Sequence, residues 1–159
     1  MQQNHSNLNA PCGLHCGVCR IYKATVENDL AYLKRLGKLY ARQFPQIAAL
    51  SSEELQCDGC LSARRFPSCQ ICAIRDCVQT KGIEGCHVCA DFPCRHIDEF
   101  PIPAGKKAIL RAVPYWRENG TQAWIQSEKE RYHCPTCGER LYRGVKQCPA
   151  CRSVVDLDG

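Results

Sequence analysis

The stretch CDGCLSARRFPSCQICAIRDCVQTKGIEGCHVCADFPC, residues 57–94, decides what kind of fold this chain can form. It carries eight cysteines: a C-x2-C pair, then eight residues, then C-x2-C-x4-C, then eight more residues and C-x2-C-x4-C again. Prolines and glycines interrupt the stretch, and polar residues fill much of it, so that burial of apolar surface alone cannot fold it. We therefore expect bound metal to supply folding free energy here.

Cysteine makes up 15 of the 159 residues, and the cellular compartment decides whether these thiols pair or bind metal. The first eleven residues lack the basic and apolar regions of a signal peptide, and no apolar run approaches the roughly 18 residues of a membrane span. We expect a cytoplasmic protein that does not associate with membranes. In a reducing compartment, an odd number of cysteines arranged in C-x-x-C pairs indicates metal ligands rather than disulfides.

The formal net charge of +5 would suggest a nucleic-acid partner, but it counts every cysteine as a neutral thiol. Twelve thiolates holding three zinc ions would lower the charge by six and leave about −1. The basic balance is therefore weak support for nucleic-acid binding.

The clearest motif is YHCPTCGERLYRGVKQCPACR, residues 132–152, which contains C-x2-C-x10-C-x2-C. Each C-x-x-C forms a tight knuckle that directs two thiolates at one point, and Gly138 follows the first knuckle where a positive φ is often needed. The spacing predicts a β zinc ribbon over residues 132–159. Its ligands would be Cys134, Cys137, Cys148 and Cys151.

The central stretch has enough thiolates for two further four-ligand sites. The spacing leaves open which cysteines share a metal, and His87 or His96 could replace a thiolate. The eight candidates are Cys57, Cys60, Cys69, Cys72, Cys77, Cys86, Cys89 and Cys94.

Three cysteines remain near the start, Cys12, Cys16 and Cys19, in the sequence CGLHCGVC. One interpretation is an ordinary zinc site completed by His15, His96 or another cysteine. The alternative is an iron–sulfur cluster, because C-x3-C-x2-C is also the spacing of radical S-adenosylmethionine enzymes. Only eleven residues precede the triplet, Val18 occupies the usual aromatic position and no strand–helix alternation follows, so we do not expect a radical enzyme.

Two cysteine-free segments predict helices. Leucines recur at helical spacing over residues 29–42, where Thr25 or Asn28 could provide the N-cap. A second pattern runs through residues 100–131 with an expected break at Pro114, and we expect it to pack against the first helix. The predicted fold is a small, metal-dominated, mostly α-helical protein with zinc-knuckle loops. Residues 1–11 would form a disordered polar tail, residues 12–131 the metal-binding domain and residues 132–159 the ribbon.

The order CGLHCGVC, helix, CDGC, CQICAIRDC and CHVCADFPC resembles a cysteine-rich family of bacteria and archaea known as domain of unknown function 3795. The resemblance spans residues 12–100. It implies metal binding in a prokaryotic cytoplasm, and it implies no particular reaction.

Three hypotheses for function follow. The first is a binding module with about three to four zinc ions that contacts another protein through the ribbon or the helices. The second is a redox protein with an iron–sulfur cluster on the N-terminal triplet. The third and weakest is a nucleic-acid-associated regulator that uses Arg140, Arg143 and Lys146. We find no constellation of catalytic residues, and the sequence favours a protein that is not an enzyme.

Overall fold

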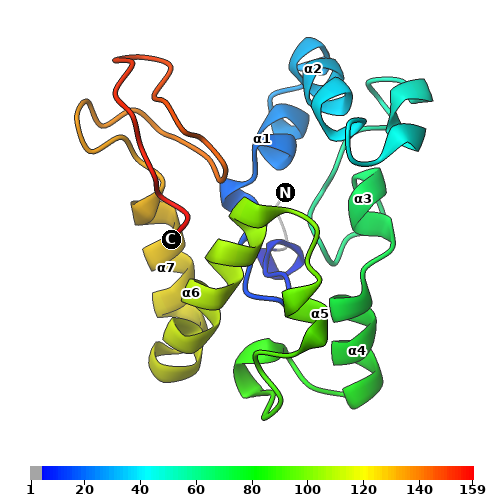
Figure 1. The fold of residues 1–159 in the computed structure, drawn as a ribbon, viewed down its shortest axis with the longest axis vertical. Helices are drawn as coiled ribbons and strands as arrows, with labels where there is room; N and C mark the ends of the chain where they lie inside the picture. Colours follow the sequence, from blue (N-terminus) through cyan, green and yellow to red (C-terminus); the bar gives the residue numbers. More distant parts are fainter. Residues whose placement is uncertain (1–4) are drawn as a thin grey trace.

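The computed structural model describes residues 5–159, with the side chains of residues 7–159 (Figure 1). Most of its regular structure is helical, as the sequence predicted. The α-helices are α1 (Arg20–Val26), α2 (Leu30–Tyr40), α3 (Pro67–Gln70), α4 (Ala73–Lys81), α5 (Arg95–Asp98), α6 (Pro103–Asn119) and α7 (Thr121–Arg131). Short 3-10 helices cover His5–Leu8, Cys16–Val18, Pro45–Ala49 and Cys86–Val88.

The helix predicted over residues 29–42 is α2, but its N-cap differs from the prediction. Asp29 is the cap, and its carboxylate accepts a hydrogen bond of 2.9 Å from the backbone N–H of Tyr32. Thr25 and Asn28 were wrong candidates. The Thr25 hydroxyl donates to the Ile21 carbonyl inside α1, and Asn28 adopts a left-handed conformation with φ 53° in the turn between the helices.

Helix α6 continues through Pro114, so the break predicted there is wrong. A proline inside a helix leaves the carbonyl four residues earlier without its hydrogen bond. Pro114 is exposed, so on that side of the helix water can donate a hydrogen bond to the carbonyl that the proline leaves unsatisfied. The helix ends instead at Gly120, whose φ of 83° is readily adopted by glycine and separates α6 from α7.

The expected packing of the C-terminal helices onto α2 is also wrong. Helix α2 packs mainly on α1 and on Pro45–Ala49, whereas α6 and α7 pack on each other and on the cysteine loops at Cys16–Val18 and Cys86–Val88. Figure 1 shows α1 and α2 in one half of the molecule and the α6–α7 pair in the other. The cysteine loops therefore occupy the position where a single helical core was expected.

Buried apolar side chains fall into four clusters rather than one core, and three of these include cysteine. Leu33, Leu36 and Phe66 belong to the cluster of α1 and α2, which also contains Cys57. A second cluster joins α4 to α6 around Ile74 and Ile109. Because each cluster is small, apolar burial in any one of them contributes only part of the stability that a domain needs.

Four rings form a continuous stack that ties the two loops to the C-terminal helices. Trp116 and Trp124 lie parallel with centroids 4.2 Å apart. His87 stacks on Trp116 at 3.6 Å, and His15 meets Trp124 edge-on at 6.0 Å. We call these four residues the ring stack. Trp124 is fully buried, so the stack holds segments together that are more than 100 residues apart in the sequence.

The ribbon region is shaped by turns rather than by strands. Within residues 5–159 no β-strand is formed, and the predicted β part of the ribbon is therefore wrong. Residues 133 and 140, and residues 147 and 154, each make a single antiparallel bridge. Between these bridges the chain turns toward the Cys16–Val18 loop, where the Arg143 N–H donates to the Val18 carbonyl at 3.2 Å. Neither bridge is therefore extended into a pair of strands.

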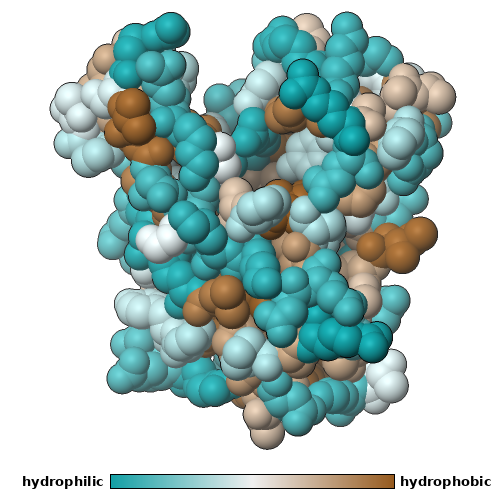
Figure 2. All heavy atoms as spheres, in the orientation of Figure 1, coloured by the Kyte–Doolittle hydropathy of each residue, from teal (hydrophilic) through white to brown (hydrophobic). Residues whose placement is uncertain are grey.

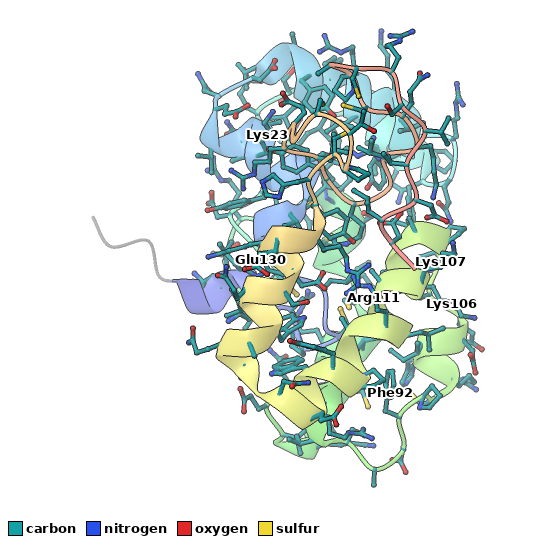
Figure 3. The ribbon with its side chains drawn as sticks, turned by 90° about the vertical axis from the view of Figure 1, so that its left-hand side faces the viewer. Lys23, Phe92, Lys106, Lys107, Arg111 and Glu130 are labelled. Atoms are coloured by element: carbon teal, nitrogen blue, oxygen red, sulfur yellow. The ribbon has the colours of Figure 1, made fainter. Side chains whose placement is uncertain are left out.

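The C-terminal segment is anchored by buried charges. Arg111 on α6 forms an ion pair with Glu128 on α7, and its Nε–H donates to the Asp158 carbonyl. The Asp158 carboxylate is buried and accepts hydrogen bonds from the Tyr132 hydroxyl and the Gly144 N–H. Figure 3 shows Arg111 between α6 and α7. These contacts hold the end of the chain under the ribbon.

The predicted polar tail ends in a segment that contacts the body. Residues 1–4 lie outside the described residues, and the disorder predicted for them stays a prediction. Leu8 and Ala10 are buried, and the Asn7 carbonyl accepts a hydrogen bond from the Leu61 N–H. Residues 8–11 thus belong to the same packed body as the domain predicted to begin at residue 12.

Among the helices of residues 5–159, none combines the length and the apolar character needed to cross a bilayer.

We predict that Trp124→Ala lowers the free energy of unfolding by about 3–5 kcal/mol, because it removes the centre of the ring stack and leaves a cavity. The measurement is chemical unfolding followed by circular dichroism at a fixed concentration of free zinc. Tyr115→Ala on exposed α6 surface is the control and should change stability by less than about 0.5 kcal/mol. Equal effects of the two substitutions would contradict this account.

We predict that Glu128→Ala destabilises the protein by about 3–5 kcal/mol, because it leaves the guanidinium of Arg111 largely buried without a counter-charge. Glu130→Ala is the matched control on the same helix, on the side away from Arg111 (Figure 3). It should cost less than about 0.5 kcal/mol in the same unfolding measurement.

Candidate metal centres

The four ribbon cysteines gather at one point. The Sγ atoms of Cys134 and Cys151 are 3.6 Å apart, as are those of Cys137 and Cys148. All four lie within 4.8 Å of one another, and they form the one such group among the described residues. Zinc with four thiolates at 2.3 Å places its sulfurs about 3.8 Å apart. The spacing of these thiols therefore fits a tetrahedral metal ion.

Local backbone geometry builds this group, because the two knuckles repeat the same hydrogen bonds. The N–H four residues after the first cysteine donates back to its carbonyl, from Gly138 to Cys134 and from Arg152 to Cys148. Both donors have positive φ, 76° and 66°. The sequence predicted this conformation at Gly138. It gave no sign of it at Arg152, since arginine rarely adopts a positive φ.

Hydrogen bonds in the ribbon favour the thiolate form at Cys134 and Cys151, whereas those among the thiols themselves help to raise the pKa of Cys137 to about 12. The hydroxyl and the backbone N–H of Ser153 hold the pKa of Cys151 at about 6, well below its usual value. The backbone N–H of Cys137 lowers the pKa of Cys134. Deprotonation of these two ligands therefore costs little free energy.

A second set of thiols lines a small cavity between α4 and α5. The cavity encloses about 20 Å³, which is enough for a single water or ion and too little for an organic ligand. Burial, followed by the effects of Cys89, Cys94 and Cys77, raises the pKa of Cys86 to about 12. The lining includes Cys77, Cys86, Cys89, Cys94 and His96.

A third set surrounds Cys12, which is buried under α4. Burial raises the pKa of its thiol well above the usual value, and Cys60, Cys72 and Cys86 are the neighbouring thiols that raise it further. The guanidinium of Arg75 lies 3.8 Å from the Cys60 sulfur. Cys12 thus lies among thiols of the central stretch.

A fourth set lies at the foot of α1. Burial raises the pKa of Cys16, and Cys19, Cys60 and Cys57 are its thiol neighbours. Cys69 is exposed as a residue, but desolvation of its thiol, followed by the effects of Cys57 and Cys19, raises its pKa to about 12. Outside the ribbon, no three of the thiols in residues 5–159 meet the same 4.8 Å limit.

The N-terminal triplet is therefore divided between two surroundings. Cys12 has neighbours from the central stretch, while Cys16 and Cys19 lie together near Cys57. Among the candidate histidines, His15 and His87 belong to the ring stack, and only His96 lines a cavity together with cysteines.

Sequence reasoning missed three positively charged side chains that lie beside the cysteine loops. The Arg75 side chain is buried and donates to the carbonyls of Cys69 and Gln70. Lys81 Nζ lies 3.4 Å from the Cys89 sulfur, and Arg117 on α6 donates to the carbonyls of His87 and Cys89. A cation near a set of thiolates offsets their negative charge. The only signal in the sequence was the basic residue inside CQICAIRDC.

The three basic residues proposed for nucleic acid are engaged by the protein itself. The Arg143 guanidinium donates to the His15 carbonyl at 2.8 Å, and Arg140 lies over the Tyr142 ring. Lys146 forms ion pairs with Asp156 and Asp158. These contacts occupy all three side chains, and the ion pairs offset the positive charge of Lys146.

Helices arranged around cysteine loops, with a four-thiol group beside them, define a cysteine-rich protein that has a group able to bind a metal ion. One family model matches residues 8–99, more than half of the chain, and it is described as "Protein of unknown function (DUF3795)". The chain belongs to this family, which confirms the resemblance seen in the sequence. No curated protein and no solved structure matches the chain. The ribbon lies beyond the matched residues.

We predict that Cys148→Ser removes one equivalent of metal, because the buried Cys148 thiol is one of the four gathered ligands. Elemental mass spectrometry of the purified protein gives the metal content. Ser127→Ala, a substitution on α7 outside the thiol groups, should leave the content unchanged. Retention of the full metal content by Cys148→Ser would show that this group holds no ion.

Proposed function

We propose that the protein is a multi-zinc protein whose metal centres hold together a cytoplasmic binding module. The observation that carries the proposal is the convergence of four ribbon thiols within 4.8 Å. This arrangement suits structural zinc, since all four positions are occupied by protein ligands and none is left for a substrate.

The other eleven cysteines support two further four-thiol sites and one three-thiol site. We propose one site of Cys77, Cys86, Cys89 and Cys94, since all four line one ion-sized cavity. A second would use Cys16, Cys19, Cys57 and Cys69, since Cys19 and Cys57 are neighbours of both Cys16 and Cys69. A third would use the three remaining thiols, Cys12, Cys60 and Cys72. Metal binding would draw each set to the sulfur spacing already present in the ribbon.

The small apolar clusters favour a structural role for the metals. A chain that buries its apolar residues in separate clusters needs another source of folding free energy, and metal–thiolate bonds supply it. We place the protein in the reducing cytoplasm, where an odd number of cysteines arranged in C-x-x-C pairs binds metal rather than forming disulfides. The partner that we propose is another protein, contacted through the ribbon or the helices.

The deciding measurement is metal content together with an absorption spectrum on protein purified without oxygen. We expect about three to four zinc per chain and no visible absorption. About four iron per chain with a brown colour would instead support a cluster on the thiols of the N-terminal loop. The absence of both zinc and iron from the purified protein would overturn the proposal.

Serine variants of the wild-type chain test how the cysteines are grouped. Cys77→Ser and Cys94→Ser should lose the same zinc ion, while Cys19→Ser and Cys69→Ser should lose a different one. Combining two variants of one set should remove no further metal, whereas combining variants of different sets should remove two ions. Native mass spectrometry counts the ions, and the opposite additivity would refute the grouping.

A further inference from the structure

A cavity of about 430 Å³ lies between the ribbon and the helices of the other half of the molecule. Its wall is mostly apolar and includes Leu39 at the end of α2 together with Phe100 and Ile102 before α6. In Figure 2 the upper edge of the molecule is notched between the ribbon and the part that carries α1 and α2. The volume is in the range of small-molecule sites.

The charged groups of the wall are all positive. Arg20, Arg143 and Lys146 line the cavity, and its described lining contains no aspartate or glutamate. Lys146 is balanced by its ion pairs with Asp156 and Asp158. Within residues 5–159, by contrast, no carboxylate lies within ion-pair distance of Arg20 or Arg143. Two guanidinium groups therefore line an apolar cavity, and neither forms an ion pair with a carboxylate of these residues.

Arg143 also has an unused donor. Its Nη2 donates to the His15 carbonyl, whereas its Nε–H is shielded from solvent and has no acceptor among the described residues. A shielded donor without a partner costs free energy, so the protein alone does not satisfy the Arg143 guanidinium fully. Arg20 is held next to it, since its Nη2 lies 3.4 Å from the Arg143 carbonyl.

We propose that this cavity binds a small organic acid, with a carboxylate or phosphate head at Arg20 and Arg143 and an apolar body against Leu39, Phe100 and Ile102. Guanidinium groups bind such heads through paired, charge-assisted hydrogen bonds. The thiols of Cys19 and Cys69 form part of the same wall. The ligand would therefore lie next to one of the proposed metal sites, but its binding does not depend on that site being filled.

The test uses decanoate, decyl phosphate and uncharged decanol as probes in calorimetric titrations of the full, metal-loaded chain. We expect saturable binding of one molecule of decanoate or decyl phosphate per chain, at least about tenfold tighter than decanol. Arg20→Met keeps much of the apolar stem and should weaken the acidic probes about tenfold without affecting decanol. Arg35→Met, on the exposed side of α2, is the matched control and should change neither.

A cavity-filling substitution tests the location. Ala104→Phe, in the wall at the start of α6, should weaken all three probes. Equal affinities for the acids and decanol, no saturable binding of either acid, or unchanged acid binding in Arg20→Met would each overturn the proposal. The metal content of every variant is measured in parallel, so that failure of the metal proposal is recognised separately.

Discussion

Eleven cysteines lie outside the ribbon, and ten of them are buried or half-buried with other thiols as neighbours. Burial, followed by repulsion between neighbouring thiols, raises the pKa of Cys12, Cys16 and Cys86, so these thiols stay protonated without metal. A divalent cation reverses this preference and turns the repulsion into ligation. The helices are arranged so that loops distant in the sequence bring their thiols together, and this requirement explains why no single apolar core forms.

Groups outside the thiol sets also position the cysteine loops. The ring stack fixes the loops of His15 and His87 against α6 and α7, and Arg117 ties the carbonyls of the second loop to α6. Arg75 does the same for the turn that precedes α4. Fixed loops reduce the entropy that each metal ion would otherwise have to remove when its ligands become ordered.

The sequence predicted local features well and distant ones poorly. The ribbon ligands followed from two C-x-x-C pairs and a glycine, since each knuckle is determined by residues that adjoin one another in the sequence. The grouping of Cys12 apart from Cys16 depends on which loops meet, and no spacing encodes that. Pro114 was misjudged because its effect depends on exposure, which a sequence does not give. The positively charged side chains near the thiols were missed because the sequence does not give their surroundings either.

The ring stack has a spectroscopic consequence. Trp116 and Trp124 are the only two tryptophans of the chain, and their indole rings lie parallel at 4.2 Å. Two transition dipoles at this short distance couple to each other, and the coupling produces a paired circular dichroism signal in the ultraviolet. The signal vanishes when the rings separate. The two outer rings of the stack belong to loops that carry cysteines. The chain therefore contains, without any added label, its own optical reporter of whether the cysteine loops are packed against α6 and α7.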